Sequence, residues 1–250
     1  MDPRLDQRTG DPVTITHAPA PTNTARITAI DLAVSTVRDL NQALHATDDG
    51  TSWVVDTPAG QHNIAVGIDR DLDLVVNGHV GYYFAGMHQK GRVTVHGSAG
   101  VGLAENIMSG TVHVTGDASQ AAAATGQGGL VVVDGNTGAR CGISMKGVDI
   151  VVGGDIGHAS AFMAQAGRLV VCGDAGEGLG DSIYEARIYV KGTVASLGAD
   201  CIEKPLRPEH LAELAELLAL AGRTDDPAEF RRYGSARTLY HFAAVNAAAY

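Results

Sequence analysis

Apolar residues recur with a period of 19 positions between about Asp73 and Lys204. In each period an aliphatic residue and a valine, separated by one position, stand four and two places before a glycine. The register holds without an insertion over seven glycines: Gly78, Gly97, Gly116, Gly135, Gly154, Gly173 and Gly192. Seven places after each glycine the residue is again small: Ala85, Ala104, Ala123, Gly142, Ala161, Gly180 and Ala199.

Each period predicts one coil of a solenoid. Two apolar residues separated by one position form a short β-strand with one buried face. We expect the glycine that follows to end the strand and to adopt backbone angles that other residues disfavour. One such unit cannot bury its apolar face alone, whereas stacked units share a continuous core.

The predicted fold class is therefore all-β, a single-stranded right-handed parallel β-helix of about seven 19-residue coils. At roughly 4.8 Å per coil the rod is about 35 Å long. A left-handed hexapeptide helix is the alternative. Its coils contain multiples of six residues and three equivalent aliphatic corners, and the period of 19 disfavours it.

Residues 1–72 predict an arm and a cap before the regular coils of residues 73–204. Residues 1–25 contain four prolines among small polar residues and are expected to form a flexible arm. Residues 26–72 are expected to form an N-terminal strand-helix cap with irregular coils. Thr36 and Asp39 match a capping box at the start of a short helix that ends near His45. A cap is expected because an open core and a free strand edge invite aggregation.

Residues 205–250 predict a C-terminal helix and a docking arm. Pro208 suits the first turn of the helix and Gly222 suits its C-terminal end. We expect this helix to cover the far end of the rod. The tail that begins at Glu229 is rich in aromatic residues for a loose segment, and it is expected to pack on the rod or on another chain.

The composition of the chain disfavours several classes of partner and several cellular locations. The chain has 250 residues and a formal net charge of −10, which disfavours binding to nucleic acid or to an anionic membrane. No apolar run is long enough to span a membrane, and the N-terminus lacks the features of a signal peptide. The three cysteines are odd in number and unclustered, so we expect a cytoplasmic protein.

Candidate chemical sites all have a plainer structural interpretation. Gly176, Gly178 and Gly180 resemble part of a nucleotide-binding loop, but a strand rather than a helix follows them. Five histidines of the repeat fall in five different columns, so no metal site is predicted. Cys201 and Cys141 are expected to be buried thiols rather than nucleophiles.

Paired acids offer a further candidate site. Asp181 and Asp200 share one column of adjacent coils, and Asp155 and Asp174 share another. Carboxylates stacked about 5 Å apart repel each other, which raises one pKa and suits acid–base chemistry. Asp and Asn after the repeat glycine are also typical of tight turns, and that interpretation is favoured.

One outward-facing column is apolar where solvent is expected. The strand residue between the two buried positions becomes Val132, Val151 and Val170 in successive coils, followed by Tyr189. Such a stripe indicates that something covers it, either the chain's own terminal segments or another subunit. We predict an interface that combines this stripe with the aromatic residues of the tail: Val132, Val151, Val170, Tyr189, Phe230, Tyr233, Tyr240 and Phe242.

The glycine-rich coils resemble the β-helical GXGXG domain at the C-terminus of the glutamate synthase large subunit, over roughly residues 26–245. They are most similar to the free-standing subunit of N-methylglutamate synthase and related complexes. The stretches that support this resemblance are GSAGVG at 97–102, AENIMSG at 104–110, RCGISMKG at 140–147, AFMAQ at 161–165, CGDAGEGLGDSIYEA at 172–186 and LGADCIE at 197–203.

The resemblance implies a non-catalytic scaffold subunit of a hetero-oligomer. In that family a class II glutamine amidotransferase subunit has an N-terminal cysteine nucleophile, and a synthase subunit binds FMN and an iron–sulfur cluster. The β-helix holds the two together. Here position 2 is Asp2, so the nucleophile is expected on a partner, and no cofactor is expected on this chain.

Two alternatives remain. The repeat also resembles the glycine-repeat subunit of formylmethanofuran dehydrogenase, which implies a scaffold in a formyltransferase/hydrolase complex. An independent enzyme on a β-helix, such as a pectin-degrading enzyme, is disfavoured because the coils contain few aromatic residues to line a sugar-binding cleft.

Overall fold

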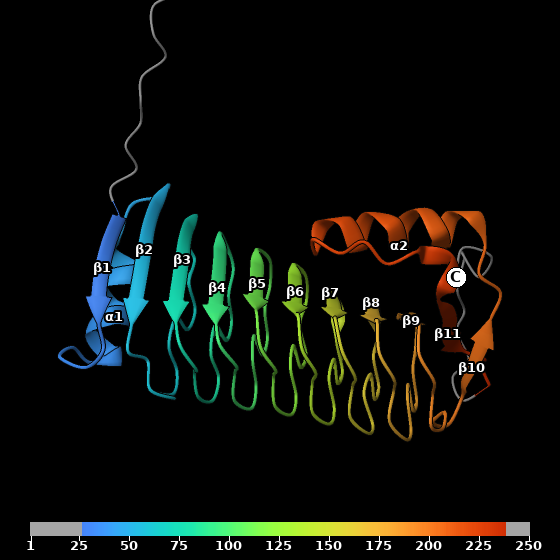
Figure 1. Ribbon diagram of the computed structural model, residues 1–250. Coiled ribbons are helices and arrows are strands. Elements are labelled where there is room, and N and C mark those ends of the chain that lie inside the picture. Colours follow the sequence, from blue (N-terminus) through green and yellow to red (C-terminus); the bar gives the residue numbers. More distant parts are fainter. Residues whose placement is uncertain (1–26, 239–250) are drawn as a thin grey trace, which may run out of the picture.

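A computed structural model describes residues 27–238 as a rod with one continuous sheet along its length (Figure 1). The strands from β1 to β9 are parallel neighbours in chain order, and the chain winds as a right-handed parallel β-helix, as predicted. The flexible arm predicted for residues 1–25 lies outside the described residues, as do Tyr240 and Phe242.

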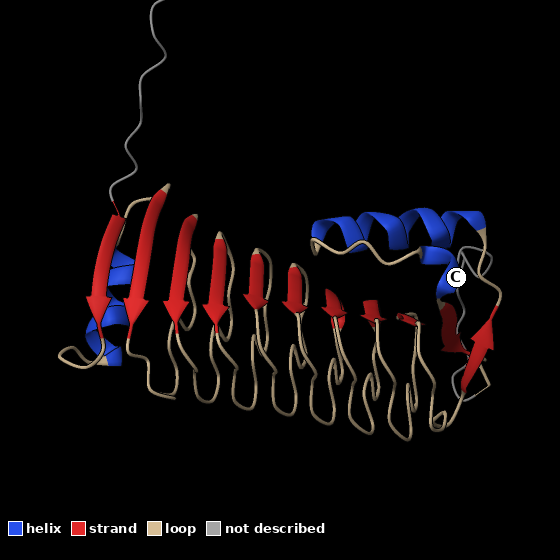
Figure 2. Cartoon of the chain, viewed as in Figure 1, coloured by secondary structure: helices blue, strands red, loops and turns tan. Residues whose placement is uncertain are grey.

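The regular coils each contribute one strand, joined by long loops that complete the coil (Figure 2). These strands are β3 (Leu72–Asn77), β4 (Arg92–His96), β5 (Thr111–Val114), β6 (Leu130–Val133), β7 (Lys146–Val152), β8 (Ala166–Val171) and β9 (Arg187–Val190). From β3 to β9 the paired residues are 19 positions apart, as in Val75, Thr94 and His113, except at a bulge at the start of β7, where Lys146 pairs with Ala166. The period seen in the sequence is therefore the length of one coil.

The N-terminal end is closed by irregular coils and a helix. It comprises β1 (Ile27–Asp31), α1 (Val37–Ala46) and β2 (Thr51–Asp56). The side chain of Thr36 accepts a hydrogen bond from the backbone N–H of Asp39, so the predicted helix start is confirmed. Leu40 and Leu44 of α1 are fully buried in the core that runs through the coils. This helix removes the open end of the core from water.

The repeat glycines serve a different purpose from the one expected. Of the seven, only Gly78 has a positive φ, of 131°. At Gly97 and Gly173, a Cβ atom would lie 2.6 Å from the carbonyl carbon of the glycine one coil earlier. Glycine is therefore required here because the backbones of adjacent coils stack closely.

Left-handed backbone occurs instead in the column of small residues. Ala85, Ala104, Ala123 and Ala161 have φ between 51° and 55° and are fully buried. Larger residues adopt this conformation elsewhere in the coils, as at Tyr83 and Met87, so the conformation alone does not limit side-chain size. From Ala85 to Gly180 the column holds only alanine and glycine because it is buried inside the coil, where a larger side chain would not fit.

The C-terminal segment adds β10 (Cys201–Lys204), α2 (Pro208–Leu220), a short 3-10 helix η1 (Pro227–Glu229) and β11 (Arg231–Ser235). Pro208 occupies the first turn of α2, and Gly222 follows its end with a φ of 71°. Both predictions for the ends of the helix are confirmed.

The position of α2 differs from the prediction. The helix does not cover the far end of the rod but lies along its side, over the outer face of the last coils (Figure 1). The sheet is instead extended by β11, which pairs antiparallel with β9 on one edge and with β10 on the other. In the sheet, β11 therefore lies between β9 and β10, although β10 comes before α2 in the sequence and β11 comes after it.

Candidate interaction surface

One column of outward-facing residues crosses the whole sheet and divides into two parts. Strand pairing aligns Ala29, Val54, Val75, Thr94, His113, Val132, Val151, Val170, Tyr189, Arg232 and Lys204 in a single row. From Val54 to His113 the side chains are partly exposed, whereas Val132 is 3% exposed and the next three are fully buried. The boundary between the two parts falls where α2 begins to overlie the sheet (Figure 1).

The buried part of the row forms a second apolar core with α2. Val151, Val170 and Tyr189 pack against three leucines of the helix, Leu214, Leu217 and Leu218, and against Phe230. The chain's own C-terminal segment therefore covers the apolar stripe, which was one of the two alternatives that the sequence left open.

This packing corrects the interface prediction. Six of its eight residues are at most 3% exposed within the chain: Val132, Val151, Val170, Tyr189, Phe230 and Tyr233. Val151, Val170, Tyr189 and Phe230 lie in the core formed with α2, whereas Tyr233 lies in the main core of the coils, so a partner cannot contact them on the folded chain. The sequence indicated correctly that the stripe is covered, but it contained no signal that assigned the cover to α2.

Polar groups join α2 to the sheet beside this core. Tyr189 donates its hydroxyl hydrogen bond to Glu213 of α2. Arg187 Nε lies 3.2 Å from a carboxylate oxygen of Glu213, and Arg168 lies 3.9 Å from the other. Arg168 also forms a bidentate pair with Asp149 at 2.7 and 2.5 Å. These contacts place an acidic side chain of the helix over a cationic row of the sheet, and they fix the helix in position.

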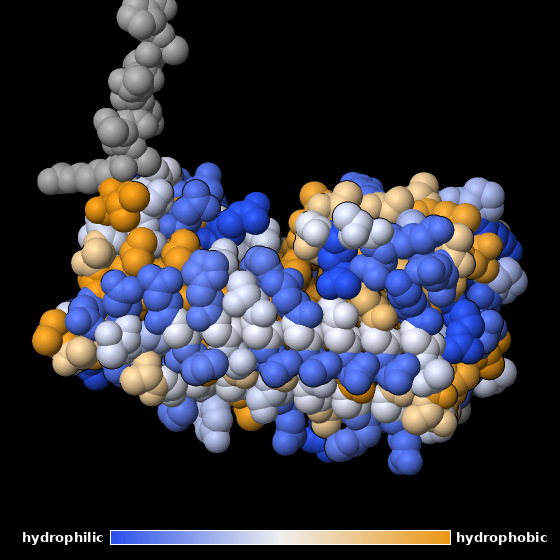
Figure 3. Space-filling model, in the orientation of Figure 1, coloured by the Kyte–Doolittle hydropathy of each residue, from blue (hydrophilic) through white to orange (hydrophobic). Residues whose placement is uncertain are grey.

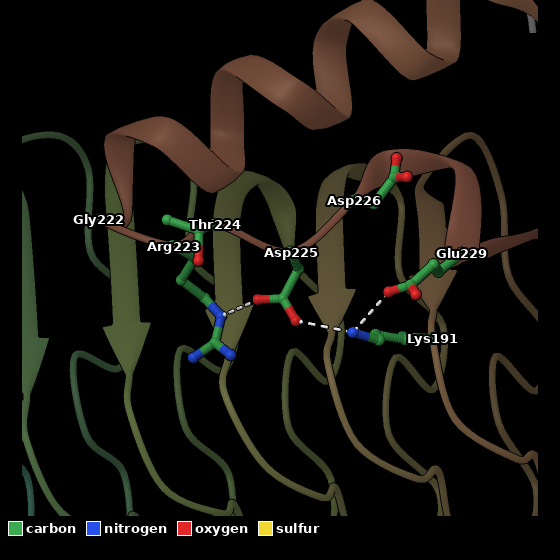
Figure 4. Close-up of a pocket in the computed structure, with 7 residues that line it drawn as sticks. All are labelled: Lys191, Gly222, Arg223, Thr224, Asp225, Asp226 and Glu229. Atoms are coloured by element: carbon green, nitrogen blue, oxygen red, sulfur yellow. Dashed lines mark hydrogen bonds and ion pairs between the residues drawn. The ribbon is translucent and has the colours of Figure 1, made fainter.

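An open polar depression lies where α2 returns to the rod, lined by Lys191 and by residues of the segment 222–229 (Figure 4). Asp225 accepts from Arg223 Nε at 2.7 Å and from Lys191 Nζ at 3.1 Å, and Glu229 lies 2.6 Å from the same Nζ. Burial opposes ionisation of Asp225, but the bonds from Arg223 and Lys191 outweigh it and keep its pKa below the usual value. The charges in this Asp225 cluster are paired with one another, so its role is to fasten the segment after α2 to the end of β9.

The cysteines are not activated. Burial raises the pKa of Cys141 and of Cys172 to about 11, and burial together with Asp200 and Asp181 raises that of Cys201 to about 12. A thiol with so high a pKa is protonated near neutral pH and is a poor nucleophile. The interpretation as structural thiols agrees with this environment.

The stacked acids act as acceptors for the backbone. Asp117, Asn136 and Asp155 each accept, through a side-chain oxygen, the backbone N–H of the residue 19 positions later, at 2.7–2.8 Å. Asp174 accepts in the same way from Thr193 at 2.6 Å, and this bond lowers its pKa rather than raising it. The expected repulsion is therefore overcome by a ladder of side-chain to backbone bonds along the turn.

The second pair of acids is also engaged in structural bonds. Asp181 accepts from Ser182 Oγ at 2.7 Å and from the N–H of Ala199 at 3.3 Å. Asp200 accepts from Ser235 Oγ at 2.6 Å and from the N–H of Thr238 at 2.8 Å. The bonds of Asp181 stay within the coils, whereas those of Asp200 tie the last coil to the end of β11 and to Thr238 after it.

Within residues 27–238, no three His, Cys, Asp or Glu side chains converge in a way that could hold a metal ion. The three glycines that resemble a nucleotide loop belong to the coil: Gly176 stacks on Gly157, and Gly178 and Gly180 adopt positive φ. The strand β9 follows them, as the sequence indicated.

No segment within residues 27–238 covers the first half of the outer sheet face. In Figure 3 the C-terminal segment forms a raised block on one end of the rod, and the surface steps down beside it over the neighbouring strands. Val54, Val75, Thr94 and His113 lie in this open part. His113 forms a 3.0 Å pair with Asp134 at the border. This open face of β2 to β5 is the candidate interaction surface.

The helices among residues 27–238 are too short or too polar to cross a lipid bilayer.

Comparisons with known proteins give one clear relative. No family model matches the chain, and no solved structure matches it. Protein GlxC of Rhizobium meliloti (strain 1021) is 61% identical over 225 residues, which cover 88% of this chain and 99% of that protein. An alignment of this length includes all of the regular coils. The chain belongs to the family of Protein GlxC.

Proposed function

We propose that this chain is a non-catalytic scaffold subunit of a glutamate synthase-like complex, of the N-methylglutamate synthase type. It would hold a class II glutamine amidotransferase-like subunit against a synthase subunit that binds FMN and an iron–sulfur cluster. The observation on which the proposal depends is the sequence resemblance of the coils at 97–102, 140–147 and 172–186 to the GXGXG domain of glutamate synthase.

The arrangement of polar groups supports a scaffold role. The carboxylates of Asp174, Asp181 and Asp200 bond to the backbone or to hydroxyls of adjacent segments, and Asp225 bonds to two cations. The three thiols are protonated near neutral pH because burial raises each pKa. The side chains best placed for chemistry thus stabilise the rod itself.

The shape supports the same role. Stacked coils with a shared core form a stiff rod whose surface positions are fixed relative to one another. On this rod, the face of β6 to β9 is occupied by α2 and the face of β2 to β5 is open. We place a partner subunit on the open face.

Co-purification tests the assignment to a complex. A tagged chain purified from its own cells should bring amidotransferase-like and flavin-containing chains with it in native mass spectrometry. The sample should absorb in the visible range, and the chain isolated alone should be colourless. A stable monomer from the same cells, with full synthase activity in extracts that lack this chain, would refute the proposal.

A pair of variants tests the position of the partner. Thr94→Arg places a long cation in the open face, and Gln120→Arg places the same side chain at an exposed position on a loop. We expect the first to weaken assembly at least tenfold while the isolated chain melts normally, and the second to have no effect. Equal assembly by both variants would exclude the open face as the contact.

A further inference from the structure

A cationic hollow lies on the outer sheet face at the C-terminal end, beside α2. Its walls contain four cations, Arg187, Lys204, Arg232 and Arg237, and one carboxylate, Glu185. The volume of the hollow is about 10 Å³, roughly room for one water-sized group. In a chain with a net charge of −10, this local excess of positive charge requires an explanation.

Two of the cations are already paired. Arg237 lies 2.9 Å from Glu185, and Arg187 lies 3.2 Å from Glu213 of α2. The other two have no ion pair among residues 27–238. Lys204 Nζ donates to the carbonyl oxygen of Ser235 at 2.8 Å.

Arg232 is the more unusual of the two. It is 5% exposed, its Nε has no hydrogen-bond partner among the described residues, and its Nη1 has only a long contact of 3.5 Å to the carbonyl oxygen of Pro205. A buried charge without a partner is costly. Burial is the main cause of a lowered pKa at both Arg232 and Lys204, and at each the neighbouring cations add to it.

The floor of the hollow is Gly234, where the fold does not require a glycine. Its φ is not positive, and a Cβ atom would meet Lys204 Cδ at 3.4 Å and the Ala186 carbonyl oxygen at 3.7 Å, which are ordinary contacts. Glycine inside a strand weakens it and often marks the close approach of a ligand. The missing side chain leaves space directly between the cations.

We propose that this hollow binds a small carboxylate anion. One carboxylate oxygen fits the space, and the group accepts hydrogen bonds from Lys204 Nζ and from the guanidinium of Arg232. The anion neutralises the two unpaired charges, and guanidinium and ammonium donors suit a planar carboxylate better than a spherical ion. The site is independent of the scaffold role, because it lies beside α2 and not on the open face.

Thermal unfolding in sodium acetate and in sodium chloride of equal ionic strength tests the proposal. Acetate at ten times its Kd should raise the Tm of the full chain by about 3 °C relative to chloride. Lys204→Gln should abolish this difference, and Gly234→Ala should abolish it by filling the floor. In chloride alone Gly234→Ala should melt no earlier than the parent, since it adds a methyl group without a clash. Lys204→Gln also loses the bond to the Ser235 carbonyl oxygen, so its Tm in acetate is compared with its own Tm in chloride.

Lys90→Gln is the matched control, because Lys90 is exposed and far from the hollow in the chain. It should keep the full difference. The proposal is overturned if acetate and chloride give the same Tm in the parent, or if Lys204→Gln and Gly234→Ala keep the difference.

A crystal structure grown in acetate gives a second readout that does not depend on stability. It should show the carboxylate within hydrogen-bond distance of Lys204 Nζ. An acidic side chain from a neighbouring copy in the same place would instead mean that the ligand belongs to a protein, and the proposal of a small anion would be wrong.

Discussion

The open and the covered halves of the outer sheet face have the same backbone and different side chains. Both halves consist of parallel strands, most of them paired 19 residues apart, and both have a valine-rich inner face. They differ in the outward row, which is Thr94 and His113 in the open half and Val151 and Val170 under α2. The inward-facing residues are alike in both halves and specify the solenoid. The outward-facing residues are apolar where α2 covers the coil and more polar where the coil is uncovered.

The sharpest way to separate the two halves is to place the same charge at matched positions of the row. Val170→Asp buries a carboxylate beneath α2 and should lower the free energy of unfolding by about 3–5 kcal/mol. Thr94→Asp in the open half should change it by less than about 1 kcal/mol. Urea unfolding measures both. Similar losses would mean that the two halves are equally buried, for instance by a second copy of the chain.

Substitutions of the stacked glycines should instead destabilise the open and the covered half by similar amounts. Gly97→Ala and Gly173→Ala each place a Cβ atom 2.6 Å from backbone of the preceding coil, so each should cost about 3 kcal/mol. Gly234→Ala, which meets no atom closer than 3.4 Å, is the control and should be neutral or mildly stabilising. If Gly173→Ala were neutral as well, close backbone stacking would not be the reason for the repeat.

The Asp225 cluster gives a change that should affect only the covered half. Asp225→Asn weakens the bonds to Arg223 and Lys191 and should cost about 1–2 kcal/mol. Amide hydrogen exchange should accelerate in α2 and remain unchanged in β3 to β5. Uniform acceleration along the rod would contradict a local role.

The pH dependence of this cluster follows from the same bonds. The pKa of Asp225 in the folded chain is below its ordinary value of 3.8, so its contribution is complete above that pH and is lost as the pH falls through the folded pKa. Asp225→Asn should therefore flatten the stability curve below about pH 4, whereas it should run parallel to the parent curve near neutrality.

Substitution of a buried histidine in the open half of the rod should give the smallest change in stability. His88 is fully buried, its Nδ1 has no hydrogen-bond partner in the described part of the chain, and burial lowers its pKa from 6.5. As the pH falls below about 6.5 the unfolded chain binds a proton first, so stability is lost down to the folded pKa. His88→Gln should reduce the slope between pH 6.5 and 5, while His158→Gln at an exposed site should not. Equal slopes in all three proteins would show that His88 is protonated without cost.

The coils could be predicted from the sequence because each one repeats the same pattern of buried and small residues. A valine in the same column of every period has the same buried position, so seven copies of a weak signal become one strong signal. The reason for glycine was not predictable, because a single period does not reveal how closely the next backbone approaches Gly97 or Gly173.

The C-terminal segment was harder to place because it occurs once. The leucines of α2 specify an apolar face but not the surface that it meets, and Leu214 would suit the end of the rod as well as its side. The pairing of β11 depends on Arg232 meeting Tyr189 and Lys204, residues that are distant from it in the sequence. The hollow beside it was also missed; its only local signal is Gly234, a glycine outside the repeat.

The insertion of β11 between β9 and β10 has a consequence for synthesis on the ribosome. The coils can stack as they emerge, but the strand that occupies the edge of β9 is translated about 40 residues later, after α2. Until then the nascent rod presents an unfilled strand edge, which is a template for pairing with another chain. The edge of β9 is therefore protected only once β11 has been made, and the interval between the two strands is when the nascent rod can most readily pair with another chain.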